Sequence, residues 1–156
     1  MGIKELIEKL EINEEDFKVK IGTVKKAHKK VVDAISTAWH ETNGWGLAKV
    51  AFAPKGGTYG IDFVGREWEQ GKISLAVEVD TWFRPYRSWM KLTDIRSINK
   101  IWVYLTNDKR ARENFEEAIS EINALLKARG EDKATLGNFI AIMKTPREFQ
   151  VKEISV

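Results

Sequence analysis

The chain has 156 residues and a mass of 17.9 kDa, with 43% hydrophobic and 31% charged residues. These figures are typical of one globular domain built around a single core, and we expect that domain to span residues 1–156. The sequence contains no cysteine and only two histidines, which excludes disulfides, thiolate catalysis and ordinary zinc centres. Any metal must therefore be held mainly by carboxylates. The formal net charge of +3 permits a polyanionic partner without requiring one.

No apolar stretch reaches the roughly 18 to 20 residues that a membrane-spanning helix needs. The opening MGIKELIEKL carries charges where a secretory signal needs a continuous apolar block. We therefore expect a cytoplasmic protein with no membrane segment. Abundant Lys and Glu together with the absence of Cys also suit a thermophile.

The first predicted element is a short helix from Ile3 to Leu10, part of an N-terminal helical extension of residues 1–20. A second helix is predicted over residues 23–41, with Thr23 as its N-cap and Asn43-Gly44 as its stop. Strands without an intervening helix come next, and alternation and turn signals place them at residues 47–53, 59–64 and 73–81.

The next predicted helix is opened by Pro85 and buries Trp89, Leu92 and Ile95. A strand over residues 101–105, a long helix from about 107 to 130 and a last strand over 139–143 complete the chain. The order α, α, β, β, β, α, β, α, β predicts an α/β (α+β) fold, in which helices pack on a mixed sheet. Residues 23–105 are expected to form the core, and residues 106–156 a C-terminal helix and strand.

Carboxylates gather on the second and third predicted strands. On the second strand, Asp62 is expected to point away from the apolar face formed by Ile61 and Phe63. On the third strand, Glu78 and Asp80 share the face opposite the apolar odd-numbered positions.

An antiparallel hairpin turning at Gln70-Gly71 would place Asp62 opposite Glu78 or Val79. Like charges side by side repel, so this arrangement needs an offsetting charge. Mg²⁺ or Mn²⁺ would supply it, because oxygen ligands from Asp and Glu are those that such hard cations prefer. The alternative is that the acids lie on the solvent face of an ordinary hairpin.

The order helix, three-strand meander, helix, strand, with Asp62 on the second strand and Glu78-Val79-Asp80 on the third, resembles the PD-(D/E)XK or restriction-endonuclease-like nucleases. The phrase Leu75-Ala76-Val77-Glu78-Val79-Asp80 is also similar to the third strand of archaeal Holliday junction resolvases, which belong to that superfamily. The resemblance covers residues 23–105. It implies an αβββαβ core and a Mg²⁺- or Mn²⁺-dependent nuclease. It further implies that Asp62 and Glu78 bind the metal and that Glu41 completes the site.

Two residues depart from the pattern of that superfamily. Ile61 stands where the motif has proline, and Asp80 stands where it has the lysine that orients or deprotonates the attacking water. Some restriction enzymes of the superfamily carry an acid at this position, and in others the basic residue has moved to the next helix. Lys91 is the candidate for such a migrated lysine. Arg84, Arg87 and Lys91 share one helix face, which is either a phosphate-binding face or a solvated one.

Several further residues are candidates for contact with nucleic acid, although a solvated surface is the alternative for each basic one. Trp82 lies near the acids in the sequence and is expected to stack on a base or to pack in a dimer interface. His28 lies in the buried phase of its helix, so we expect a core histidine and not a ligand. The basic candidates on the two long helices are Lys25, Lys26, Lys29, Lys30, Lys109, Arg110 and Arg112.

Two main functions remain open at this stage. The first is a metal-dependent nuclease that cleaves DNA as a homodimer, with Asp62, Glu78, Asp80 and Lys91 as its catalytic residues. The second is a nuclease-fold protein that has lost catalysis and acts as a nucleic-acid-binding or interaction module, for which Asp80 is the main argument. A third possibility is a structural or regulatory α/β domain that does not bind nucleic acid.

Overall fold

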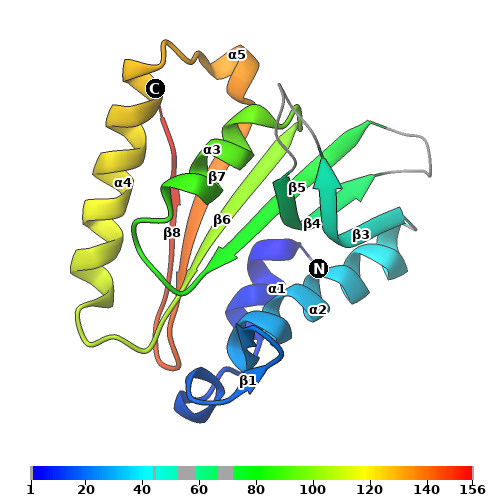
Figure 1. The fold of residues 1–156 in the computed structure, drawn as a ribbon, viewed down its shortest axis with the longest axis vertical. Helices are drawn as coiled ribbons and strands as arrows, with labels where there is room; N and C mark the ends of the chain where they lie inside the picture. Colours follow the sequence, from blue (N-terminus) through cyan, green and yellow to red (C-terminus); the bar gives the residue numbers. More distant parts are fainter. Residues whose placement is uncertain (1, 44, 53–58, 67–71, 156) are drawn as a thin grey trace.

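The computed structural model describes residues 2–43, 45–52, 59–66 and 72–155 (Figure 1). Six strands form the main sheet, and their order across the sheet follows the chain: β3 (Trp45–Phe52), β4 (Tyr59–Arg66), β5 (Ile73–Asp80), β6 (Asn99–Leu105), β7 (Asn138–Lys144) and β8 (Phe149–Glu153). Neighbouring strands are antiparallel from β3 to β5 and from β7 to β8, whereas β5, β6 and β7 run parallel. The predicted α+β fold with a mixed sheet is therefore confirmed.

Helices cover both faces of this sheet (Figure 1). The first face packs against α3 (Tyr86–Asp94) and α4 (Ala111–Ala128), and the predicted core residues Trp89, Leu92 and Ile95 are all buried there. The second face packs against α1 (Ile3–Lys9), the 3₁₀ helix η1 (Glu14–Phe17) and α2 (Lys26–Asn43). A short α5 (Lys133–Leu136) precedes β7.

The start of the second helix differs from the prediction. Thr23 is not an N-cap, because it lies in the turn between two short strands, β1 (Lys20–Ile21) and β2 (Val24–Lys25). Gly22 adopts a φ of 67°, which a glycine tolerates without strain, and this allows the tight turn. The helix therefore begins only at Lys26, and the predicted stop at Gly44 lies outside the described residues.

The N-terminal extension packs closely against the rest of the chain. Ile7, Ile12 and Phe17 are buried in the same hydrophobic cluster as α2 and one face of the sheet. The ammonium of Lys144 on β7 donates a hydrogen bond to the carbonyl of Glu8 (2.6 Å), which fixes the end of α1 to the sheet. Residues 2–18 thus contribute core side chains as well as surface.

The expected alternation on β4 is interrupted at Asp62. Ile61 packs with the α3 and α4 face, whereas Phe63 packs with the α2 face, so the expectation that they share one face is wrong. The paired register with β5 ends at Phe63 and Val77, and Asp62 lies just beyond it. The chain is thus free to turn its side chains there, at the position of the candidate carboxylate. The predicted turn at Gln70-Gly71 lies outside the described residues.

The distance between α2 and β4 is set by a glycine. A Cβ atom at Gly65 would lie 2.5 Å from Cε2 of Trp39, so the indole rests directly on the glycine backbone. The indole N–H of Trp39 donates to the carbonyl of Arg66 (3.0 Å), which fixes the ring in this position. Helix α2 is therefore held close to β4.

Two C-terminal elements were missed from the sequence, namely α5 and the edge strand β8. Strand β8 is short and ends in the exposed residues Lys152 and Glu153, which break the apolar alternation that identifies a strand. Within the part of the chain that the structure describes, no helix is both long enough and apolar enough to cross a membrane.

Candidate functional site

Asp62 and Glu78 lie where β4 separates from β5, close enough for the charge of Asp62 to raise the pKa of Glu78. The register of the hairpin continues to Phe63 opposite Val77. At the next position, the backbone N–H of Val79 donates a hydrogen bond to Oδ2 of the Asp62 side chain (2.7 Å). This hydrogen bond holds the Asp62 carboxylate beside the end of β5, as the predicted hairpin required.

Glu78 and Asp80 point to the same side of β5, toward helix α3. The hydroxyl of Ser88 lies 3.2 Å from Oε2 of Glu78 and 3.1 Å from Oδ1 of Asp80, so it donates its one proton to either carboxylate. The indole N–H of Trp102 on β6 donates to Oδ2 of Asp80 (3.0 Å). Asp80 therefore has neutral hydrogen-bond donors on both oxygens.

Lys91 supplies the positive charge of this cluster. Its ammonium lies 3.0 Å from Oε1 of Glu78 and donates a hydrogen bond to the carbonyl of Gly60 (2.7 Å). Because Lys91 follows Ser88 by three residues, both side chains lie on the same face of α3. Pro85 at the start of the helix favours this helical turn. The structure thus brings Lys91, the candidate for a migrated lysine, to the predicted carboxylates.

The acids of this cluster are not fully compensated. Burial raises the pKa of Glu78 from 4.5 to about 8; the negative charge of Asp62 adds to the increase, and Lys91 opposes it. Burial also raises the pKa of Asp80 from 3.8 to about 6, although the hydrogen bonds from Ser88 and Trp102 favour its charged form. Near neutral pH the cluster therefore holds a proton on Glu78 and a largely ionised Asp80.

Sequence reasoning missed three members of the cluster. His28, expected to be a core histidine, lies with its Nε2 3.3 Å from Oδ2 of Asp62. Ser88 was given no role, although its spacing of three from Lys91 places it on the same helix face. Trp102 is buried in the core, and its indole N–H also donates to Asp80.

The structure does not bring the other predicted site residues into this cluster. Glu41 is exposed near the end of α2 and makes no described contact with Asp62 or Glu78. Arg84 forms ion pairs with Glu117 and Glu121 on α4. Among the remaining candidates for nucleic-acid contact, Lys25 is half-buried in β2, and Lys29 pairs with Asp33 at 2.6 Å. Trp82 is exposed on the segment between β5 and α3, and Arg87 is exposed on α3.

The residues of the cluster fit a divalent cation through two carboxylates. Among the described residues, no group of three or more His, Asp or Glu side chains is arranged to hold a metal ion. A complete protein cage is not needed for Mg²⁺, which usually binds through one or two carboxylates together with water and substrate phosphate. Oε1 of Glu78 is shielded from solvent and accepts no well-formed hydrogen bond from a described residue, although the ammonium of Lys91 lies nearby. The Asp62 and Glu78 pair is thus the donor set that fits.

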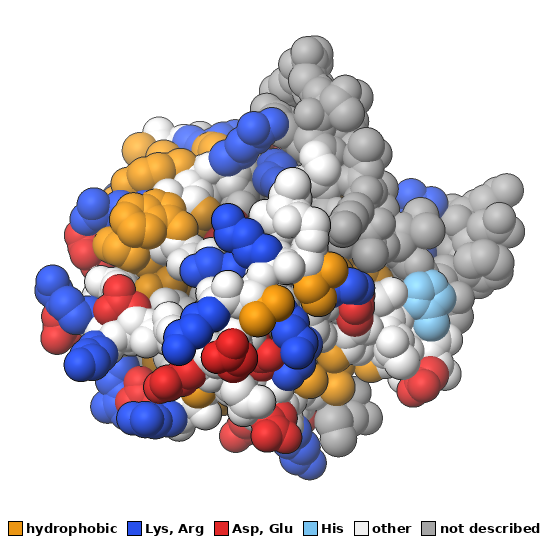
Figure 2. Space-filling view, turned by 60° about the horizontal axis from the view of Figure 1, so that its bottom comes forward, with side chains coloured by type: hydrophobic (Ala, Val, Ile, Leu, Met, Phe, Trp, Pro, Cys, Tyr) orange, Lys and Arg blue, Asp and Glu red, His pale blue; other side chains and the backbone are white. Residues whose placement is uncertain are grey.

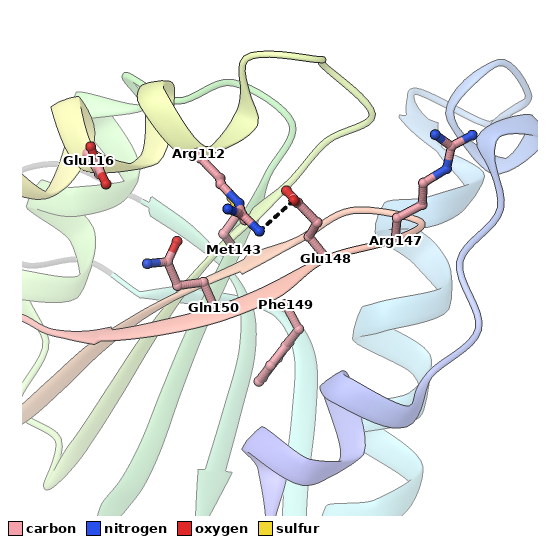
Figure 3. Close-up of a pocket in the computed structure, with 7 residues that line it drawn as sticks. All are labelled: Arg112, Glu116, Met143, Arg147, Glu148, Phe149 and Gln150. Carbon is pink, nitrogen blue, oxygen red and sulfur yellow. Dashed lines mark ion pairs between the residues drawn. The ribbon is translucent and has the colours of Figure 1, made fainter.

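A separate hollow of about 530 Å³ lies between the start of α4 and the β7–β8 hairpin (Figure 3). Its rim charges are compensated, because Arg112 forms an ion pair with Glu148 at 2.9 Å. Arg147, at the tip of the hairpin, pairs with Glu14 at 3.6 Å. Figure 2 shows basic and acidic side chains interspersed over this end of the molecule. The hollow therefore lacks the uncompensated buried charge that distinguishes the carboxylate cluster.

The fold and the cluster together define an α+β protein with a carboxylate and lysine site on one face of a mixed sheet. Comparison of the chain with known protein families, with curated proteins and with solved structures found no match.

Proposed function

We propose that this chain is a metal-dependent nuclease of the restriction-endonuclease-like type that cleaves DNA phosphodiester bonds. The proposal is carried by one observation, which is that Lys91 on α3 reaches Glu78 on β5, beside Asp62 on β4 and Asp80. The element order α2, β3, β4, β5, α3, β6, with β5 and β6 parallel, supports the αβββαβ core that such enzymes have. In this proposal Lys91 on α3 takes the role of the motif lysine, whose position on β5 is occupied by Asp80.

Asp62 and Glu78 would hold Mg²⁺ or Mn²⁺, which would stabilise the charge that develops on the scissile phosphate. Asp80 is the candidate base, because a carboxylate with a pKa of about 6 is mostly ionised at neutral pH and accepts a proton from water more readily than an ordinary Asp. Lys91 would contact the phosphate and hold Glu78 in place. Since one such site cuts one strand, we propose that the chain works on duplex or branched DNA as a homodimer.

A cleavage assay with matched variants tests this proposal. We expect labelled DNA to be cut in the presence of Mn²⁺ or Mg²⁺, and cleavage to be lost in Asp62→Asn and in Glu78→Gln. Asp33→Asn is the control, because Asp33 is an exposed acid on α2 that pairs with Lys29 at 2.6 Å and is not a member of the cluster. Full cleavage by both site variants, with purity confirmed by a second preparation, would eliminate the assignment.

A second candidate function is favoured by the position of Lys91. Its ammonium lies 3.0 Å from Oε1 of Glu78 and opposes the effects of burial and of Asp62 on that carboxyl group, so the chain itself already supplies part of the compensating charge. In that case the chain would be a nuclease-fold protein without catalysis, which binds nucleic acid or a protein partner. Melting curves with and without Mn²⁺ separate the two functions, because only an ion-binding site raises the melting temperature as the ion concentration increases. Glu78→Gln should abolish that increase.

A further inference from the structure

Two large aromatic side chains are exposed on the segment that joins β5 to α3. Trp82 is 58% exposed and Tyr86 is 50% exposed, and both follow closely after Asp80 of the carboxylate cluster. The Cα atoms of Asp80 and Trp82 are at most about 7 Å apart, since each residue extends the chain by no more than about 3.6 Å. The backbone of Trp82 therefore lies close to the end of the strand that carries Glu78 and Asp80.

This segment is held in place by contacts on its inner side. The ring of Phe83 packs against Trp82 at a centroid distance of 4.9 Å, and it reaches Tyr104 of the core at 6.3 Å. The guanidinium of Arg84 lies 5.0 Å from the centre of the Phe83 ring and forms ion pairs with Glu117 and Glu121 of α4. The Trp82 side chain is thus exposed on a segment with a fixed backbone, which lowers the entropy cost of binding a flat partner.

The charges around Trp82 favour contact with a base over contact with phosphate. Arg84 is the nearest cation in sequence, and its ion pairs with Glu117 and Glu121 cancel its charge. The hydroxyl of Tyr86 also donates to Glu121 (2.7 Å), so Glu121 is bound by both Tyr86 and Arg84. An aromatic ring in such surroundings gains little from a phosphate but gains fully from stacking on a neutral base.

We propose that Trp82 is the stacking platform for an unpaired base next to the scissile phosphate, so that among duplex and branched DNA the site takes molecules with a single-stranded or frayed segment in preference to continuous duplex. In a duplex each base is covered by its neighbours on both faces, so an indole reaches a base face only where pairing and stacking are interrupted. This inference rests on the proposed nuclease function, because it names the substrate class of that same site.

The test measures binding without cleavage. Fluorescence anisotropy with the full chain in EDTA compares a labelled 15-nucleotide single strand with a blunt duplex of the same sequence. We expect the wild type to prefer the single strand, and Trp82→Ala to weaken that binding by about ten- to hundredfold, the range seen when one stacking aromatic is removed. Binding to the duplex should change little, and Trp82→Phe should keep most of the affinity.

Ile98→Ala is the matched control, because Ile98 is also exposed (60%) but lies on the loop before β6. The proposal is overturned if the wild type does not bind the single strand, if Trp82→Ala leaves its affinity unchanged, or if the variant weakens single-strand and duplex binding equally. It is also overturned if Trp82→Ala converts a dimer into a monomer on size-exclusion chromatography with light scattering, which would make this surface an interface between copies.

Failure of this inference is distinguishable from failure of the nuclease proposal. The binding measurement contains no metal and does not depend on Asp62 or Glu78. Persistent metal-dependent cleavage that is lost in Asp62→Asn, together with unaltered single-strand binding in Trp82→Ala, would keep the nuclease and reject the platform. Selective single-strand binding through Trp82 without any cleavage would keep the platform and reject catalysis.

Discussion

The pKa values of two buried acids in this molecule, Asp16 and Glu78, are shifted in opposite directions. Asp16 on η1 is 2% exposed, and Glu78 on β5 is 3% exposed. Burial raises the pKa of Asp16, but the amide of Asn13 and the ammonium groups of Lys30 and Lys26 outweigh it and leave that pKa below its ordinary value. The pKa of Glu78 is raised, because burial and the negative charge of Asp62 outweigh the opposing effect of Lys91. Burial alone therefore does not mark a functional carboxylate, whereas incomplete compensation of its charge does.

The difference between these groups reflects how each is built. Asp16 accepts the N–H of Asn13 at 2.9 Å and the ammonium of Lys30 at 2.8 Å, so it fixes η1 onto α2 as a closed unit. Among the described residues, the cluster of Asp62, Glu78 and Asp80 has an ion pair with one cation, Lys91, and the pKa of Glu78 remains raised, so the cluster retains capacity for another positive group. We interpret Asp16 as structural and the β5 cluster as functional.

The largest expected effect concerns Lys91, the lysine that pairs with Glu78. Lys91→Met should lower the single-turnover cleavage rate by about a hundredfold or more, because a charged group positioned at a reacting phosphate contributes on that scale. The control is Lys152→Met, which removes an exposed lysine from the edge strand β8. Equal rates for Lys91→Met and wild type would remove Lys91 from the catalytic residues.

The next effect compares the two acid groups directly by urea unfolding at pH 7. Asp16→Asn should lower the free energy of unfolding by about 2 kcal/mol, because it removes a buried charge that accepts hydrogen bonds from the Asn13 amide and from the half-buried Lys30. Glu78→Gln should change it by less than about 1 kcal/mol, since Glu78 already holds a proton at pH 7 and glutamine is a neutral side chain of the same shape. Similar losses in both variants would contradict the distinction between a structural and a functional acid.

The pH dependence of stability separates the groups by sign. The pKa of Glu78 is raised from 4.5 to about 8, so the folded protein holds a proton that the unfolded chain releases between these values. This contribution to stability is present below pH 4.5 and is lost as the pH rises through about 8. Asp16 behaves oppositely, because its pKa is lowered and its contribution is lost as the pH falls through that value.

Unfolding between pH 5.5 and pH 8.5 measures this difference. The wild type should lose on the order of 2 kcal/mol more stability over that range than Glu78→Gln, because each unit of pKa difference corresponds to about 1.4 kcal/mol. A parallel pH profile for the two proteins would show that Glu78 titrates normally in the folded state.

The smallest effect concerns the hydroxyl between the two carboxylates of β5. Ser88→Ala should raise the pKa of Asp80 further, because the Ser88 hydrogen bond favours the charged form of Asp80. The expected cost in stability is about 1 kcal/mol, the usual net contribution of one hydrogen bond. Carbon-detected NMR titration of the Asp80 carboxyl measures the shift, and Ser97→Ala, on the loop before β6, is the control.

Much of this arrangement could be predicted from the sequence, because it follows from local patterns. The alternation on β5 placed Glu78 and Asp80 on one face, and the hairpin register placed Asp62 beside Glu78. The helical spacing after Pro85 also placed Lys91 close enough to reach the acids. These inferences need only the periodicity of single elements and one hairpin.

The parts that could not be predicted depend on contacts between distant elements. His28 reaches Asp62 from α2, and no local pattern distinguishes it from a core histidine. The opposite orientations of Ile61 and Phe63 arise where β4 leaves its partner, which a strict period of two does not describe. Thr23 was assigned to a helix because its composition suits an N-cap, whereas Gly22 forms a turn there.

The contact between Gly65 and Trp39 makes the position of His28 depend on a residue that has no side chain. Trp39 follows His28 by three turns of α2, so both side chains leave the same face of the helix. Any side chain at position 65 would collide with the indole, displace α2 from β4 and move the imidazole away from Asp62. In a saturation mutagenesis library selected for nuclease activity, position 65 should therefore tolerate as few replacements as position 62.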